Sequence, residues 1–270
     1  VTMKKINRNK TIELLLNIAP VVGLVLLAAA FLIIANLKDV NISYSFKNII
    51  NQSIITMVVA TGAIYIYTLG SFDISLGASM SLLNALVLVL IKLNGKGDVV
   101  QIPATAVKGL NTIWFKLLIL FLFGALCVLT FNYMKLGRQE KFVGGNPECA
   151  KLTGLNAKTL SILGFAMAGL GVGLGAFLTI TYAPTLSRNT AGSVGMDVII
   201  SIVFGGMPVS GGARSKIYSA IVGSLSMTLL SQIMLMLNLN SGIGQMVKAT
   251  IFLLVVYVSM LNSKKNILPR

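Results

Sequence analysis

The sequence predicts an all-α protein, a polytopic transmembrane bundle of about eight helices. Hydrophobic residues make up 56% of the 270-residue chain and charged residues only 11%, whereas soluble domains carry about 25% charged residues. Apolar runs of about 20 residues, long enough to cross a hydrocarbon layer, recur along the chain. Lys and Arg gather at the ends of these runs, as they do in cytoplasmic loops. We therefore expect a single membrane domain, residues 1–270, in the plasma membrane.

Four spans are predicted in the first half of the chain. A cationic segment at 3–10 precedes the first apolar run, which begins like a signal peptide. The alanines at 28–30 are followed at once by FLII and not by a polar region, so we expect a retained span. Polar external loops are expected at 41–48 and 92–111. The predicted spans are 14–37, 49–69, 74–91 and 113–133.

A polar, basic island follows at residues 135–158 (KLGRQEKFVGGNPECAKLTGLNAK). It holds five Lys or Arg residues and two acids, together with four glycines and a proline. Because cations near span ends set the orientation of a membrane protein, we expect the island in the cytoplasm. The short helical pattern PECAKL between glycines favours a docking surface for another protein.

Four more spans are predicted after the island, with an external loop at 183–194. The first is rich in small residues (GFAMAGLGVGLGAF), which let helix backbones pack closely. The second is short and bounded by glycines, so it either crosses or re-enters. If it crosses, the chain makes eight crossings, and both termini and the island lie on the cytoplasmic side. These spans are 160–182, 195–209, 217–237 and 243–261.

Composition argues against several other functions. The net charge of +15 comes from cations at span ends and not from a stripe alternating with aromatic residues, so we expect no nucleic-acid partner. The chain has no histidine, which excludes a Ser-His-Asp triad and a histidine metal site. Cys127 and Cys149 are too few and too far apart for a ligand motif, and no Walker sequence occurs. We expect no catalytic residue, no metal site and no cofactor.

Two acidic residues beside predicted spans are functional candidates. Asp73, in GSFDISLGASM, lies where helix-end amides stabilise a carboxylate. It is either an N-cap, with Ser75 and Gly77 assisting close packing, or a residue of a translocation path. Asp197 opens the short segment GMDVIISIVFGG, where a cap or interfacial role again competes with a path role. The glycine-rich stretch 205–216 is the kind of break that exposes backbone to a substrate cavity.

Four amides lie within or near predicted spans: Asn51, Gln52, Asn84 and Gln232. Sugar recognition needs paired donors and acceptors of this kind, but intramembrane amides more often hydrogen-bond between helices. Both roles stay open from the sequence. A loose internal echo also relates TLGSFDISLGASMSL to VFGGMPVSGGARSKIYSAIVGSL, as in transporters with repeated halves.

Three ordered motifs resemble the permeases of ribose-type ABC importers. The island's GRQEKFVGGNPECAKLTGL is similar to their cytoplasmic coupling segment, in which Gly-Arg precedes Gly-Gly-Asn, an Ala-rich turn and Ser/Thr-Gly. GSFDISLGASM is similar to their Gly-x-x-Asp-Leu-Ser-x-Gly element. AGSVGMDVIISIVFGGMPVSGG is similar to their Gly-Tyr-Glu-Leu-Asp…Gly-Gly-Thr…Gly-Gly element, with Gly195-Met196 where the family has Glu before Leu-Asp. The family normally has two further spans where this chain has only the 92–111 loop.

The resemblance implies a division of labour. Two permease copies, identical or different, would form the path in the lipid bilayer, cytoplasmic ABC ATPase subunits would hydrolyse ATP, and an extracellular sugar-binding protein would deliver a monosaccharide or related polar solute. The island would sit in a groove of the ATPase and transmit its closure to the helices. The implied coupling residues are Arg138, Gly145, Asn146, Glu148, Ala150, Leu152 and Gly154. The implied path residues are Asp73, Ser75, Asn84, Asp197 and Ser210.

Individual roles follow from the same resemblance. Asn146 and Gly154 would be turn-forming caps of the coupling segment. Glu148 would be either an ion-pair partner for the ATPase or an exposed loop charge. Two alternatives for the whole chain also stay open: an ion-coupled secondary transporter that uses Asp73 and Asp197 as proton or sodium sites, or an inactive, shortened permease relative. Neither alternative makes the chain an enzyme.

Overall fold

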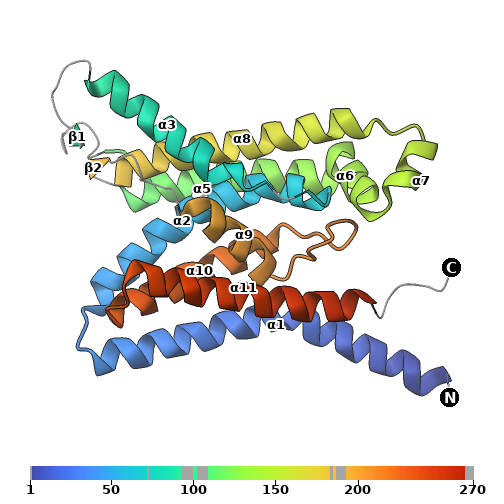
Figure 1. Cartoon of the computed structure of the whole chain (residues 1–270), viewed down its shortest axis with the longest axis horizontal. Coiled ribbons are helices and arrows are strands. Elements are labelled where there is room, and N and C mark those ends of the chain that lie inside the picture. The colour runs from blue at the N-terminus through green and yellow to red at the C-terminus, as the bar shows by residue number, and fades with distance from the viewer. Residues whose placement is uncertain are drawn as a thin grey trace.

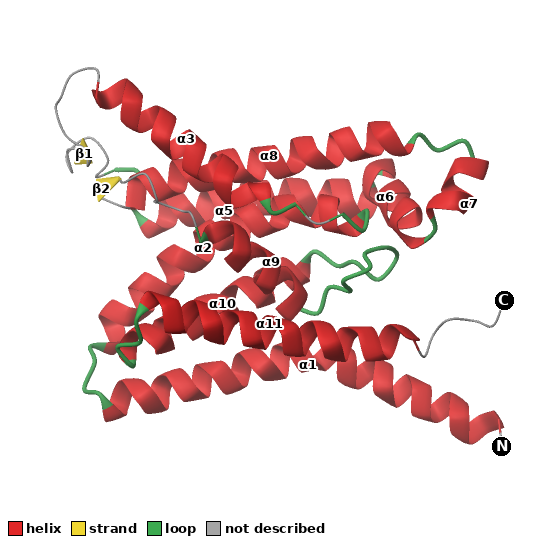
Figure 2. Cartoon of the chain, viewed as in Figure 1, coloured by secondary structure: helices red, strands yellow, loops and turns green. Residues whose placement is uncertain are grey.

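The computed structural model describes residues 2–71, 73–92, 100–101, 109–182, 185–186 and 193–264. These residues are mostly helical (Figure 2). A π-helical turn, Leu129–Tyr133, continues α5 toward α6. The helices are α1 (Thr2–Leu37), α2 (Ile42–Thr68), α3 (Ser75–Lys92), α5 (Ile113–Val128), α6 (Lys135–Gly145), α7 (Pro147–Leu152), α8 (Ala157–Tyr182), α9 (Val194–Phe204), α10 (Tyr218–Met236) and α11 (Ser241–Lys264).

Five helical segments of the described chain are long and apolar enough to cross a membrane. They are Ile18–Leu37, Ile42–Thr68, Ile113–Tyr133, Ala157–Tyr182 and Tyr218–Met236. The apolar parts of α3, α9 and α11 are shorter, at Ser75–Val87, Val194–Phe204 and Ser241–Tyr257. Each of the eight predicted spans therefore contains a helix, whereas the number of membrane crossings stays a prediction.

The predicted external loop 41–48 is wrong, because α2 begins at Ile42 once Asn41 caps it. The other two predicted external loops are only partly described. Residues 93–99, 102–108, 183–184 and 187–192 lie outside the described residues, as does the basic tail beyond Lys264. Within these loops, β1 (Val100–Gln101) and β2 (Thr185–Leu186) pair antiparallel. This two-residue ladder joins the segment before α5 to the segment after α8, and the all-helical prediction did not include it.

α2 lies at the centre of the bundle. Almost every side chain from Ser53 to Thr68 is buried, because the helix is apolar on all its faces and its neighbours cover it. It packs against α8 along one side and against α9 and α10 on another (Figure 1). Gly62 of α2 lies so close to α8 that a Cβ there would be 2.8 Å from the carbonyl oxygen of Met167. The prediction that the small residues of 160–182 form a packing helix is confirmed.

The two ends of the bundle differ in what they carry. The N-terminal end of α1, the C-terminal end of α11, and α6 with α7 all lie at one end, whereas β1 and β2 lie at the opposite end (Figure 1). The island and these ends of the two terminal helices therefore lie at one end of the bundle, while the side of the membrane on which they lie stays a prediction.

α9 is a short helix within the bundle. Its 11 residues extend about 16 Å at 1.5 Å per residue, roughly half of a ~30 Å hydrocarbon layer. Its start meets the start of α3, because a Cβ at Gly195 would lie 2.7 Å from the backbone nitrogen of Gly77. The beginnings of two family-like motifs thus contact each other.

Candidate functional site

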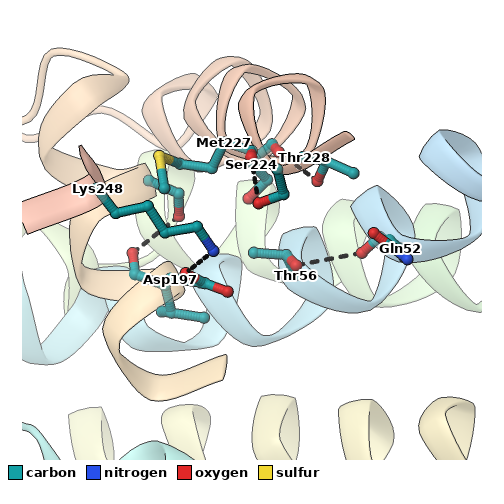
Figure 3. Close-up of polar contacts among 10 residues, drawn as sticks. Gln52, Thr56, Asp197, Ser224, Met227, Thr228 and Lys248 are labelled. Atoms are coloured by element: carbon teal, nitrogen blue, oxygen red, sulfur yellow. Dashed lines mark hydrogen bonds and ion pairs between the residues drawn. The ribbon is translucent and has the colours of Figure 1, made fainter. Parts of the chain in front are cut away.

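A small polar cavity lies where α2, α9 and α10 meet (Figure 3). Its volume is about 40 Å³, enough for two or three water molecules at about 15 Å³ each. A solute as large as a monosaccharide would require these helices to separate. The lining residues are Gln52, Thr56, Asp197, Met227, Thr228 and Ser231.

Asp197 meets a cation at this cavity. Lys248 of α11 donates from Nζ to Oδ1 of Asp197 at 2.7 Å, and the two side chains are only 15% and 22% exposed, respectively. Asp197 lies in the first turn of α9, where the helix dipole favours a carboxylate. The ion pair links α9 to α11 and balances the charge of the acid in largely apolar surroundings (Figure 3).

The neutral polar groups at the cavity are suited to hydrogen bonding. The hydroxyls of Thr56, Thr228 and Ser231 each donate to a backbone carbonyl one turn earlier in their own helix. Each hydroxyl oxygen retains acceptor capacity for a ligand. Close by in α10, Ser224 Oγ and Gln232 Oε1 are buried without a hydrogen-bond partner in the described structure. The arrangement suits a small solute with several hydroxyl groups.

The polar island folds into two short helices with defined caps. The side chain of Asn146 accepts a hydrogen bond from the backbone nitrogen of Cys149 at 3.1 Å and caps α7. Gly154 follows α7 with φ +77, a conformation that favours glycine. The prediction that Asn146 and Gly154 are turn-forming caps is therefore confirmed.

The same segment presents a mixed surface at its end of the bundle. Leu152 is 88% exposed, while Ala150 is buried and anchors α7. Glu148 is exposed and pairs with Lys151 at 3.2 Å. Arg138 is also exposed and donates to the carbonyl oxygen of Tyr133 at 2.8 Å. The exposed groups leave α7 accessible to a partner.

α6 is joined to the membrane helices through backbone contacts. The backbone nitrogen of Gly212, in the loop after α9, donates to the carbonyl oxygen of Thr68 at 2.8 Å. A Cβ at Gly144 of α6 would overlap that same carbonyl oxygen, and one at Gly212 would lie 3.0 Å from Cα of Gly145. The end of α2, the end of α6 and the loop before α10 therefore meet with no side chains between them. Movement of α6 would pass directly to both neighbours.

Glu140 of α6 is an unpaired buried acid. Its side chain is fully buried, and neither carboxyl oxygen has a hydrogen-bond partner in the described structure. It lies between α2 and α8, where a Cβ at Gly164 would be 3.2 Å from Oε1 and also close to Tyr65 and Leu69. Burial raises the pKa of Glu140 to about 8. In the sequence, this residue is distinguished only as one of the island's charges.

Comparison with known proteins places the chain in a transport family. The family model described as "Branched-chain amino acid transport system / permease component" matches residues 94–261, more than half of the chain. The chain belongs to this permease family. It is accordingly a multi-pass inner-membrane protein and a transport component.

Curated relatives of this permease include proteins named for sugars. It is 32% identical to the probable ABC transporter permease YphD of Escherichia coli over 55% of this chain and 45% of that protein. It is 28% identical to the xylose transport system permease XylH of Haemophilus influenzae, over 56% of this chain and 40% of that protein. It is 26% identical to the ribose import permease RbsC of E. coli, over 47% of this chain and 39% of that protein. The matches cover less than half of each relative, and no solved structure matches the chain.

The permease does not gather all of its predicted path residues into one site. Of the five, Asp197 lines the described cavity. Asp73 accepts a hydrogen bond from the backbone nitrogen of Ser75 at 2.8 Å, which is the capping arrangement. Asn84 is buried in α3 with both side-chain amide atoms lacking partners in the described structure, and Ser210 is exposed in the loop after α9. A path role for these residues stays a prediction.

Sequence reasoning overlooked two lysines of the permease. Lys248 is a lone cation inside the predicted span 243–261, and ionisable residues in spans are costly and usually functional. Lys116 is fully buried, and its Nζ donates to Oδ1 of Asn51 at 2.7 Å and of Asn111 at 2.6 Å. Asn51 thereby links α2 to α5, one of the two roles that the sequence left open.

Proposed function

We propose that this permease is the membrane-spanning subunit of an ATP-driven ABC importer for a monosaccharide or a similar small hydroxylated solute. The observation that carries the proposal is the backbone joint between α6, the end of α2 and the loop before α10. It connects an exposed docking segment to the helices that line a polar cavity. Such a connection lets a separate motor protein move the helices of a path.

The docking segment would bind a cytoplasmic ATPase. The exposed Leu152 supplies an apolar contact and Glu148 and Arg138 supply charges, while Ala150 anchors the segment. Asn146 and Gly154 shape its turns, and Gly145 ends α6 beside Gly212. The common position of the island and both terminal helices (Figure 1) supports cytoplasmic termini and about eight crossings. A second permease copy and an extracellular binding protein would complete the importer.

The solute class rests on the cavity and on the named relatives. Two relatives are permeases for xylose and ribose, whereas the family description names branched-chain amino acids. Hydroxyl and amide groups around Asp197 suit hydroxylated solutes better than apolar side chains. The proposed path includes Asp197 together with Asp73, Ser75, Asn84 and Ser210.

The test is to disrupt the docking segment without disturbing the spans. Glu148→Lys and Gly154→Asp should abolish ATPase association and sugar uptake, because they change the charge and the turn geometry of an exposed segment. Membrane insertion should be unchanged. Trp114→Ala, at an 83% exposed residue of α5, is the matched control. Normal ATPase association and uptake in both variants would contradict the proposal, and uptake that survives ATP depletion but collapses with an uncoupler would favour ion coupling.

A further inference from the structure

One acidic side chain lines the cavity, and one basic side chain beside it balances the negative charge. Among the residues that line it, Asp197 is the one that carries a charge. Lys248 pairs with it at 2.7 Å from another helix, and both side chains are at least three-quarters buried. Every other lining side chain is neutral, so the described cavity has no net charge.

Such a pair acts differently on charged and neutral solutes. In a medium of low dielectric constant the interaction between charges is stronger than in water. An anion that approaches Lys248 must also face Asp197, and a cation that approaches Asp197 must face Lys248. Removing either partner leaves the other charge buried and uncompensated. A neutral hydroxyl group avoids this conflict, since it can donate to the free oxygen of Asp197 while the pair stays intact.

We propose that Lys248 is a specificity-determining residue, which pairs with Asp197 so that the cavity rejects anions and cations alike. This inference rests on the proposed function, because it assumes that solutes pass this cavity. The element of specificity is repulsive: it excludes the wrong solute and adds little affinity for the right one. Because the two charges come from different helices, α9 and α11, the filter persists only while those helices stay together.

The experiment measures the charge selectivity of the cavity directly and needs no binding protein. A Ser231→Cys reporter at the cavity is made in a Cys149→Ser background, which removes the exposed native thiol. Membranes carrying the full chain together with its ATPase, but without a binding protein, are treated with one of three methanethiosulfonate reagents. The hydroxyethyl reagent is neutral, the sulfonatoethyl reagent is anionic and the trimethylammonioethyl reagent is cationic. Labelling of the Cys149→Ser protein without the reporter is subtracted from each labelling rate. The corrected rate is then divided by the rate at which the same reagent reacts with a free thiol in solution.

Opposite shifts are expected in the two single variants. Asp197→Asn leaves Lys248 unbalanced and should raise the anionic-to-cationic rate ratio at least about tenfold, while Lys248→Met should lower it by a similar factor. Lys248→Arg preserves the pair and should keep the original ratio, which controls for loss of folding.

Two results would overturn the inference, and they differ in what else they overturn. In the first, both single variants keep the anionic-to-cationic rate ratio of the unchanged pair while the neutral reagent still labels the reporter. That result would show that the pair does not select by charge, but the proposed path would stand. A reporter that none of the three reagents labels would show that solutes do not reach this cavity. In that case the proposed path at Asp197 fails and the inference fails with it.

Discussion

Replacing Glu140 with glutamine should stabilise the permease at neutral pH and should remove a pH dependence. The Glu140 carboxyl is fully buried without a hydrogen-bond partner in the described structure. Its ordinary pKa is 4.5, and burial raises it to about 8 in the folded protein. Between these two values the folded protein holds a proton that the unfolded chain releases.

The direction and the size of the change in stability follow from the difference between the folded and unfolded pKa of Glu140. Because the folded state binds more protons between pH 4.5 and 8, the free energy of unfolding falls as the pH rises through that window. Below pH 4.5 there is no penalty. At pH 7, keeping the carboxyl protonated costs about 3 kcal/mol, at about 1.4 kcal/mol for each pH unit above its ordinary pKa. Glutamine has the shape of the protonated acid, so the variant avoids this cost.

Thermal unfolding of the purified full chain in detergent, measured from pH 4.5 to pH 8, checks the prediction. Glu140→Gln and the unchanged protein should unfold together at the acidic end, and the variant should become progressively more stable as the pH rises. Glu148→Gln is the control, since it removes an 81% exposed carboxylate from the neighbouring helix. Parallel curves for Glu140→Gln and the unchanged protein would refute the burial of Glu140 between α2 and α8.

Other substitutions test the packing elsewhere. Gly223→Ala should cost about 1–3 kcal/mol, because a Cβ there would overlap the carbonyl oxygen of Ser201. Gly124→Ala in α5, where a Cβ meets nothing within 4 Å, should instead raise the stability by about 0.5–1 kcal/mol, because alanine favours a helix interior more than glycine does. Lys116→Met should cost about 1–3 kcal/mol by removing charged hydrogen bonds to the half-buried Asn51 and the exposed Asn111, and an unchanged midpoint would argue against those contacts. Gly212→Ala forces a side chain into φ +86 at the joint, so uptake should fall at equal membrane levels; full uptake would show that the joint does not transmit movement.

The helices could be predicted from the sequence because the length and hydrophobicity of a span are local properties. The predicted span 160–182 corresponds closely to α8, and 113–133 matches α5 with its π-helical turn. The predicted span 49–69 lies within α2, but α2 begins earlier, at Ile42. Some predicted ends differ from the observed ones. α1 begins at Thr2, well before the apolar run, and α9 stops at Phe204, short of the predicted end at 209.

The partners of the polar side chains could not be predicted in this way. Asp197 was singled out as an acid beside a span, but its partner Lys248 lies 51 residues away in another helix. Asn51 was recognised as an amide that needs a partner, and its partner Lys116 lies 65 residues away. A single sequence records which groups need partners and does not record which distant group is brought to them.

Glu140 shows the difference between what the local sequence determines and what the packing of the helices determines. The sequence by itself determined an all-helical membrane protein with a capped polar island, because hydrophobic run length, charge at span ends and cap residues all act over a few neighbouring positions. Only the tertiary structure decided that this acid of the island is buried, that the glycines of the island and of the loop after α9 meet at one joint, and that Asp197 faces a lysine. Burial and ion pairing depend on which helices pack together, and that is a property of the whole chain.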